Sequence, residues 1–536
     1  MRHRIELLAA LALAAIAVAL VFESGSRGFF PLDQSNVFEG GYRLLRGQVP
    51  YRDFLMPVGP LAFVIQAPFF LLFGVNNHAH LWHSGVVNAM AALLAVRCVK
   101  RLFPDAVVPA YLAGLVTAAW FYPIFGTPAF DQTALFFHLV ALVVLLPALE
   151  AAPAAAGGRG AALWSGLLSG LAFFSKQNAG ALSVVCLLLL ILVLGGARRA
   201  PLALRFLVGL GVCGGLFLLW LLLFSDVRGF LRHFIALPVA EGLRRVASAE
   251  YRAGMLAGIR SSGLTLALVL LGPLLSLGGL ALHARSLFAG GRPALPRRST
   301  LGFAVALSLA SLQWVFIRVT SNLPDNAFGF AGLADVLALL AALEALWPGG
   351  PAAVGSWKRM AQAGLVAVVA LPLAFAGRDL ARSRLVHDYW FEIHYRNAPV
   401  SRALAPARWS ARHDDPRAIR VEDVDALVDF LRERGDPFFV FPDFVALYGL
   451  AGAEPPQPLL WFHRGLTYPT QYDEELDRRI VRELVRHRVR YVVVESVSFL
   501  GTEKRLSHFP LLRDYLARFR PLLSYGIFEV RETAER

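Results

Sequence analysis

The residues best suited to chemistry gather in one polar stretch, 29–76, of a chain that is otherwise mostly apolar. This stretch combines two aspartates, Asp33 and Asp53, with three arginines, Arg43, Arg46 and Arg52, and with several aromatic residues. A carboxylate can accept a proton from an attacking hydroxyl group, and an arginine fork suits the oxygen atoms of a phosphate. Such a stretch in an apolar chain indicates that the chemistry lies at the outer face of a membrane.

Three more charged residues lie beside apolar segments farther along the chain. Lys176 and Arg318 each follow such a segment, and Asp131 precedes one. A charge at this kind of position is costly unless it is paired or reaches an aqueous surface. For Lys176 and Arg318, anion binding therefore competes with a snorkelling, interfacial role. For Asp131, helix capping is the favoured interpretation.

The residues of the polar stretch also have structural interpretations. Asp33 could cap the helix that follows it, because aspartate is a favoured N-cap residue. Arg43 lies on a predicted surface helix, where it could contact anionic lipid headgroups. Asp53 could pair with Arg52 or fix the turn, which is the favoured interpretation for this acid. Three histidines at 78, 80 and 83 begin an apolar segment without an HExxH pattern, so a membrane–water interface is favoured over a metal site.

The composition predicts a polytopic α-helical membrane protein. The chain has 536 residues, of which 57% are apolar and 17% charged, and soluble domains typically contain about 25% charged residues. Apolar runs near the ~20 residues that cross a bilayer recur through the first 376 positions. The net charge of +14 does not indicate nucleic-acid binding, because the basic residues are spread among short loops. The three cysteines form neither a disulfide framework nor a CxxC metal site.

About eleven spans are expected. The segment 61–73 is apolar but short, and we expect it to form an interfacial helix. The protein is expected in the cytoplasmic (inner) membrane. Basic residues in alternate loops place its N-terminus on the cytoplasmic side, and an odd number of spans places the C-terminal region outside. The predicted spans are 7–22, 80–98, 107–122, 132–149, 163–174, 179–194, 202–224, 264–282, 301–316, 331–346 and 364–375.

The chain is expected to divide into two domains. Residues 1–377 form the multi-span membrane domain, with a first outer loop at 23–79, and residues 378–536 form an extracytoplasmic α/β domain. Alternating helical and strand patterns support the second domain. Its helices are predicted at 421–431, 476–485 and 511–519, and its strands at 437–441, 491–495 and 522–530.

Several short motifs follow one another around the predicted spans. They are Asp33, Tyr42-Arg43-Leu44-Leu45-Arg46-Gly47, Pro50-Tyr51-Arg52-Asp53-Phe54, Gly59-Pro60 with Phe73-Gly74, the glycine-rich segment from Gly166 to Lys176, and the loop from Arg318 to Asp325. In this order they resemble the motifs of GT-C glycosyltransferases, and in particular those of the bacterial relatives of lipid A aminoarabinose transferases and protein O-mannosyltransferases. Many relatives have two adjacent acids after the first span, whereas here Asp33 is followed by Gln34.

The resemblance implies an enzyme that moves a sugar from a polyprenyl-phosphate carrier to a lipid, glycan or protein acceptor of the cell envelope, with inversion at the anomeric carbon. It implies that Asp33 is the catalytic base, with Asp53 and Asp131 as secondary acidic candidates. Cationic groups would stabilise the departing phosphate, and the candidates are Arg43, Arg52, Lys176 and Arg318. No metal ligands are assigned and no cofactor is certain, although a divalent metal ion remains open.

Two other classes of function are consistent with the sequence. A lipid or sugar transporter, or a flippase, would also have many spans, but the two halves of the chain show no clear internal repeat. A non-catalytic envelope assembly protein could retain the fold without the chemistry, and Gln34 keeps that alternative open.

Overall fold

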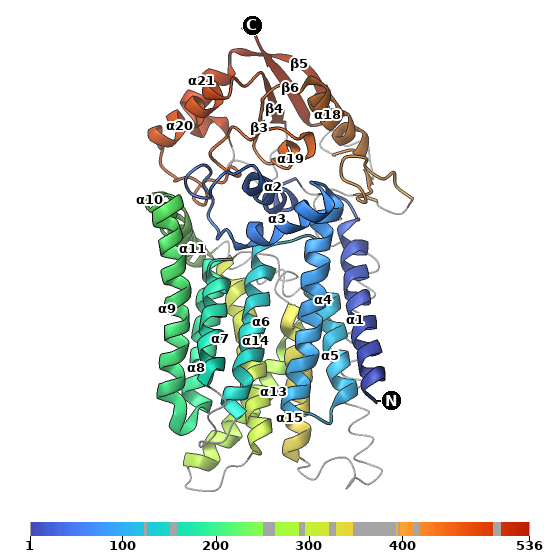
Figure 1. The fold of residues 1–536 in the computed structure, drawn as a ribbon, viewed down its shortest axis with the longest axis vertical. Helices are drawn as coiled ribbons and strands as arrows, with labels where there is room; N and C mark the ends of the chain where they lie inside the picture. Colours follow the sequence, from blue (N-terminus) through green and yellow to red (C-terminus); the bar gives the residue numbers. More distant parts are fainter. Residues whose placement is uncertain are drawn as a thin grey trace.

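The structure, a computed structural model, consists mainly of a bundle of long helices with a small sheet at one end (Figure 1). It describes residues 2–29, 31–122, 126–150, 159–249, 263–288, 295–320, 329–346, 393–394, 397–411, 419–496 and 505–534. We call the end of the bundle that carries the N-terminus the lower end, and the end that carries the sheet the upper end, as they lie in Figure 1.

Helices occupy ten of the eleven predicted spans, and the eleventh, 364–375, lies outside the described residues. Four of the described helices are long and apolar enough to cross a membrane by length and composition: His3–Gly25, Phe130–Glu150, Gln177–Leu194 and Gly196–Phe224. The ten helices are α1 (Arg2–Gly25), α4 (Asn77–Leu102), α5 (Val107–Trp120), α6 (Phe130–Glu150), α7 (Arg159–Phe173), α8 (Gln177–Leu194), α9 (Arg199–Phe224), α13 (Gly263–Phe288), α14 (Arg297–Thr320) and α15 (Ala331–Leu346).

Basic side chains from the loops predicted to be cytoplasmic lie at the lower end. The ammonium group of Lys100 lies 2.7 Å from the carboxylate of Glu6, and the guanidinium group of Arg101 lies 2.6 Å from that of Glu150. Arg198 donates a hydrogen bond of 3.0 Å to the carbonyl oxygen of Ala148. The basic residues thus connect helix ends that are far apart in the sequence.

Short helices lie at the upper end of the bundle, except for the turn η1 (Gly196–Arg198), which precedes α9. The segment predicted to be an interfacial helix is α3, and it ends at Gly74, whose φ of +78° suits a residue without a side chain. The upper helices are α2 (Asp33–Leu45) and α3 (Leu61–Phe73), between α1 and α4, followed after α9 by α10 (Val227–Phe230), the π-helix η2 (Leu231–Ala236) and α11 (Leu237–Ala247).

The C-terminal elements form a four-stranded sheet in the order β3-β4-β6-β5, covered by helices. β3 pairs with β4 in parallel, and β6 is antiparallel to both β4 and β5. The prediction of one strand at 522–530 is wrong, because Gly526 (φ +53°) turns the chain and divides this region into the hairpin β5–β6. The elements are β1 (Ile393–His394), β2 (Ser410–Ala411), α18 (Val421–Arg434), β3 (Phe438–Phe441), α19 (Leu447–Ala451), α20 (Glu474–Arg486), β4 (Tyr491–Glu495), η6 (Leu506–His508), α21 (Pro510–Leu516), β5 (Phe519–Tyr525) and β6 (Phe528–Thr533).

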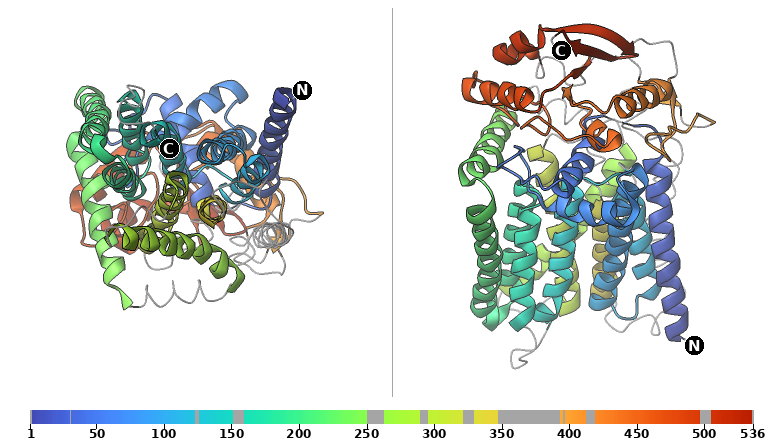
Figure 2. Two further views of the ribbon diagram at one scale, coloured as in Figure 1. Left: turned by 90° about the horizontal axis from the view of Figure 1, so that it is seen from below. Right: turned by 45° about the horizontal axis from the view of Figure 1, so that its top comes forward.

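Alternation along the central strands gives the sheet two apolar faces. Phe438 and Val440 belong to a core shared with α18, whereas Phe439 and Phe441 belong to a core shared with α20 and α21. The first core also includes Phe38 of α2, so the sheet domain packs directly on the upper end of the bundle (Figure 2). The predicted domain boundary at 377/378 lies outside the described residues.

Two glycines allow α7 and α9 to approach closely. A Cβ atom at Gly166 would collide with the carbonyl oxygen of Phe206, and one at Gly209 would collide with that of Leu163. Gly166, the first glycine of the segment 166–176, thus allows α7 to pack closely against α9.

We expect Gly209→Leu to separate α7 from α9, because the new side chain meets backbone atoms that cannot move aside. The loss of stability should be about 1–3 kcal/mol, seen as a lower melting temperature of the detergent-purified protein. Gly211→Leu is the matched control, since a Cβ at Gly211 meets nothing within 4 Å. Equal melting temperatures for the two variants would contradict this account of the packing.

Candidate functional site

The polar stretch that follows the first span contacts the turn between α7 and α8. The backbone N–H of Gly59 donates to the carbonyl oxygen of Ser175 at 3.2 Å, and the side-chain amide of Gln177 donates to the carbonyl oxygen of Pro57 at 3.0 Å. A Cβ atom at Gly59 would collide with the carbonyl oxygen of Phe174, so this contact requires glycine. The Gly59-Pro60 motif and the end of the glycine-rich segment thus meet at the upper end of the bundle.

Lys176 and Asp131 form an ion pair at this junction. Lys176 lies in extended backbone immediately before α8, and Asp131 lies in the first turn of α6. The side chains are 18% and 9% exposed, respectively, so the pair is only partly accessible to solvent. A helix N-terminus also favours the negative charge of Asp131. The sequence favoured helix capping for Asp131 and left both anion binding and a snorkelling role open for Lys176, and the structure brings the two side chains together.

Asp33 and Arg318 lie at helix ends, and their side chains are outside the described part of the structure. Asp33 is the first residue of α2, with Leu32 in the capping position. Arg318 lies in the last turn of α14, which begins at the lower end of the bundle and runs upward (Figure 1). Their backbone positions place both residues toward the upper end, where α2 and the α7–α8 turn also lie.

Arg43 is buried beneath the C-terminal sheet domain rather than exposed on a surface helix. Its Nε donates to the carboxylate of Glu39 at 3.0 Å, and its Nη1 donates to Gln48 Oε1 at 3.1 Å and to the carbonyl oxygen of Gln457 at 3.0 Å. The side chains of Arg43 and Glu39 are both 0% exposed. Contact with lipid headgroups or with a donor phosphate would require access that this guanidinium group lacks. The burial of Arg43 therefore indicates that it positions α2.

The environment of Glu39 explains why Arg43 is needed there. Burial raises the pKa of the Glu39 carboxyl group, and the charge and hydrogen bond of Arg43 oppose this shift. Tyr448 lies on the other side of the guanidinium group, with its ring centroid 6.0 Å from Arg43 Cζ, and its hydroxyl group donates to Gln457 Oε1 at 2.6 Å. One buried network thus joins α2 to α19 and to the segment that follows it.

Arg52 and Asp53 form an exposed pair in the turn that precedes α3. Arg52 donates to both carboxylate oxygens of Asp53, at 2.9 and 2.8 Å, and the backbone N–H of Val49 donates to the same carboxylate at 2.7 Å. Partial burial alone would raise the pKa of Asp53, but these hydrogen bonds and the charge of Arg52 hold it below its usual value. Arg52 also donates to the carbonyl oxygen of Phe224, at the end of α9. Asp53 thus fixes the turn, and Arg52 remains accessible to a ligand.

The side chains of His80 and His83 are buried inside the upper end of the bundle, where protein groups cover them. The Nδ1 atoms of both rings lie about one hydrogen-bond length from Gln66 Oε1, at 2.9 and 3.0 Å. Helix α3, which carries Gln66, packs over both histidine rings. No group of three or more His, Cys, Asp or Glu side chains that could hold a metal ion occurs among the described residues.

Most of the residues that surround the candidate side chains and that the sequence did not predict are uncharged. Gln66, Tyr448 and Gln457 showed no local signal, because their contacts join segments far apart in the chain. Glu39 did have a signal, since an acid four residues before Arg43 on a helix is placed to form an ion pair with it.

We expect Arg43→Ala to weaken the attachment of the sheet domain to α2. The change leaves Glu39 buried without its cationic partner, and breaking a buried ion pair typically costs about 3–5 kcal/mol. Thermal unfolding of the purified protein measures the loss. Arg101→Ala removes the more exposed pair with Glu150 and should cost no more than about 1 kcal/mol. A similar melting temperature for the two variants would show that the Arg43 network does not hold the domain.

Comparisons with known proteins agree with this arrangement at the level of fold. No protein-family profile and no curated protein sequence matches the chain. Among solved structures, ArnT from Cupriavidus metallidurans bound to undecaprenyl phosphate is similar with a TM-score of 0.51 and 15% identity, over 98% of each chain. The Archaeoglobus fulgidus oligosaccharyltransferase in complex with zinc and sulfate has a TM-score of 0.48 and 14% identity, over 98% of this chain and 73% of its own.

A third structure, the arabinofuranosyltransferase AftD from Mycobacteria, has a TM-score of 0.44 and 15% identity, over 98% of this chain and 40% of its own. The similarity to ArnT carries the argument, because it covers nearly the whole of both proteins, including the helical bundle and the C-terminal elements. The chain therefore has the GT-C fold.

Proposed function

We propose that this protein is an integral-membrane glycosyltransferase that transfers a sugar from a polyprenyl-phosphate donor to an acceptor of the cell envelope. The observation that carries the proposal is the similarity in fold, over 98% of both chains, to ArnT, whose structure contains undecaprenyl phosphate. Fold alone does not determine activity, so the charged groups of the upper end supply the second support. In this proposal the N-terminus lies in the cytoplasm, and the sheet domain lies outside the inner membrane.

The proposed reaction is a single displacement at the anomeric carbon. The acceptor hydroxyl attacks this carbon, its proton passes to the Asp33 carboxylate, and the bond between the sugar and the carrier phosphate breaks with inversion. A positioned base typically contributes about 10²–10⁴-fold in rate. Asp33 suits this role by its position, because it begins α2 within the polar stretch that follows the first span.

Cationic groups would stabilise the negative charge that develops on the departing phosphate. Lys176 is the first candidate, because its ion pair with Asp131 holds an ammonium group at a partly accessible position on the upper end. Arg52 is accessible there as well, and Arg318 lies on the last turn of α14. Arg43 would act indirectly, by fixing the α2 helix that begins with Asp33.

We expect Asp33→Asn to lower transfer by about 10²–10⁴-fold, because the amide cannot accept the proton. Mass spectrometry of envelope glycans and lipid-linked sugars, in cells that carry the wild-type protein, the variant or neither, measures the effect. The product should disappear and the lipid-linked donor should accumulate in the variant. Asp105→Asn is the control, since Asp105 is an exposed aspartate in the turn between α4 and α5, at the lower end.

If an Asp33→Asn protein that is inserted in normal amounts retained wild-type transfer, Asp33 would not be the base. If cells with and without the wild-type protein had identical glycans and lipid-linked sugars, the transferase proposal itself would be wrong.

We expect Lys176→Ala to weaken the binding of undecaprenyl phosphate by about tenfold, because a charge-assisted contact with the phosphate is lost. Titration of the detergent-purified protein with this lipid, followed by native mass spectrometry, measures the affinity. Lys100→Ala is the matched control, because it removes a lysine–carboxylate pair at the lower end of the bundle. Equal affinities for the two variants would remove Lys176 from the donor site.

A further inference from the structure

A pocket of about 180 Å³ lies in the C-terminal sheet domain, and none of its lining residues is assigned to the donor. It is formed between the loop 464–473 and the segment 507–510. The side chains that matter for its chemistry are Arg464, Tyr468, Tyr472, Asp473 and His508. The pocket combines aromatic surface with hydrogen-bonding groups, which is the combination that suits a sugar ring.

The polar groups of the pocket are held in place before a ligand arrives. Arg464 donates to the carbonyl oxygen of Thr470 through Nε at 3.0 Å and through Nη2 at 2.6 Å. The hydroxyl group of Tyr468 and Nδ1 of His508 are 2.9 Å apart. Tyr472 is 53% exposed, and its hydroxyl group donates to Asp477 at 3.3 Å. Such fixed donors and an accessible aromatic ring reduce the conformational entropy lost on binding.

The side of the pocket formed by Arg464 and His508 carries positive charge, whereas the acids Asp477 and Glu474 lie near Tyr472. Burial, followed by the charges of Arg464 and Arg505, lowers the pKa of His508. The acid of the pocket, Asp473, forms an ion pair with Arg232 and accepts a hydrogen bond from the backbone N–H of Leu476 at 3.1 Å. The charge of Asp473 is thus compensated, and the backbone N–H groups of Leu511 and Leu512 donate to Asp477. Arg464 contributes a positive charge at the rim. This balance favours a ligand that carries a negative charge.

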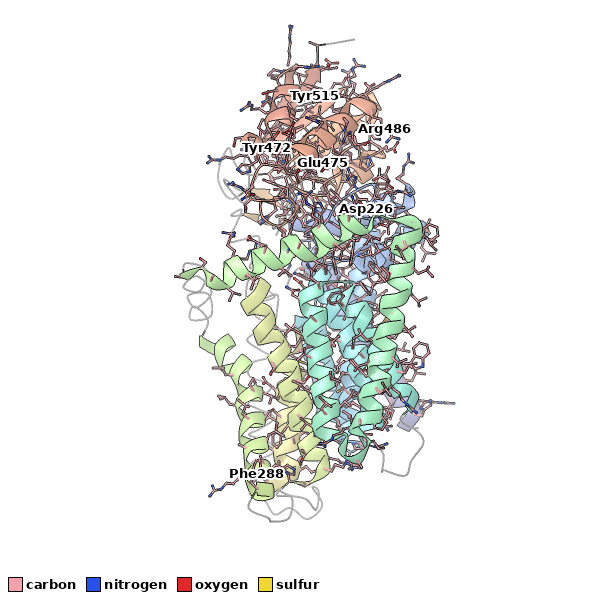
Figure 3. The ribbon with its side chains drawn as sticks, turned by 90° about the vertical axis from the view of Figure 1, so that its left-hand side faces the viewer. Asp226, Phe288, Tyr472, Glu475, Arg486 and Tyr515 are labelled. Atoms are coloured by element: carbon pink, nitrogen blue, oxygen red, sulfur yellow. The ribbon has the colours of Figure 1, made fainter. Side chains whose placement is uncertain are left out.

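The pocket loop is attached to the helices that cross the upper end of the bundle. Besides the Arg232–Asp473 ion pair, Nδ1 of His233 donates to the carbonyl oxygen of Thr467 at 3.2 Å. Both contacts lead to η2, which continues into α11. Figure 3 shows α11 crossing the top of the bundle, with Tyr472 and Glu475 above it.

The exposed side of α11 is apolar, as expected for a helix at a membrane surface. Val239 and Leu243, one turn apart, are 52% and 68% exposed, and Arg244 and Arg245 follow them in the sequence. The pocket therefore lies where a sugar attached to a membrane-anchored molecule could reach it.

We propose that this pocket binds an anionic sugar unit, a phosphorylated sugar or a uronic acid, of the acceptor. The assignment to the acceptor rests on the proposed function, whereas binding of the sugar in the pocket is tested without any transfer. The phosphate or carboxylate of the sugar would lie beside Arg464, and its ring would contact Tyr472. Arg464 and Tyr472 would act as binding residues and take no part in bond breaking.

The test measures binding of three sugars to the full-length, detergent-purified protein in the absence of donor. The probes are mannose 6-phosphate, trigalacturonate and the neutral trisaccharide maltotriose, with inorganic phosphate as a further ligand. We expect the two anionic sugars to bind, and maltotriose and inorganic phosphate to bind at least about tenfold more weakly. Tyr472→Ala should weaken binding of the anionic sugars by about fivefold and Arg464→Ala by about tenfold. Arg486→Ala, an exposed arginine near the other end of α20 (Figure 3), is the matched control and should bind like the wild type.

The proposal is overturned if neither anionic sugar binds, or if Tyr472→Ala binds them as the wild type does. It is also overturned if inorganic phosphate binds as tightly as the anionic sugars, because the pocket would then be a simple anion site. Because Arg464 bonds the backbone of its own loop, the Arg464 variant could fail to fold. Tyr472 is exposed, so its variant tests the proposal in that case. Sugar binding together with unchanged envelope glycans would contradict the transferase proposal alone, and normal transfer without sugar binding would contradict this inference alone.

Discussion

The upper end of the molecule depends on the buried guanidinium group of Arg43. A permanently charged group with no solvent access must have its partners in place, since an unpaired buried charge costs several kcal/mol. Glu39 comes from the same helix, whereas Gln48 comes from the following turn and Gln457 from the sheet domain. Satisfying one side chain thus requires α2, its loop and the sheet domain to be assembled together, and this fixes the helix on which Asp33 lies.

A second convergence lies between the first polar stretch and the turn that joins α7 and α8. Gly59 allows two backbones to touch, and the ion pair of Lys176 with Asp131 lies beside that contact. The Gly59 contact joins segments separated in the sequence by α3 to α7, and the ion pair joins the start of α6 to the residue before α8. The positions suited to acid–base chemistry and to phosphate binding therefore share one end of the bundle, the end covered by the sheet domain.

The sheet domain is connected to η2 and α11 as well as to α2. The Arg232–Asp473 pair and the bond from His233 to Thr467 connect η2 to the loop that forms the wall of the pocket. The same loop continues from Leu459, which pairs with Leu55 of the first polar stretch. A ligand in the pocket would thus contact a segment that reaches both η2 and the loop before α3.

The sequence by itself determined the elements that depend on local pattern. Apolar runs of sufficient length became the helices of the bundle, because a backbone without access to water must form its hydrogen bonds within a helix. The periodicities of the C-terminal region also predicted its central strands and helices, although the turn at Gly526 was missed.

The tertiary structure decided which charges are buried and which are paired. From the sequence, Arg43 was predicted to lie on a surface helix, but in the structure it is buried and donates to Gln457. Asp131 was predicted to cap a helix, but in the structure it forms an ion pair with Lys176. The burial of Arg43 depends on a contact with a segment hundreds of residues away, and the pairing of Asp131 on one tens of residues away. The free energy of a charged side chain depends on its neighbours in space more than on its place in the sequence.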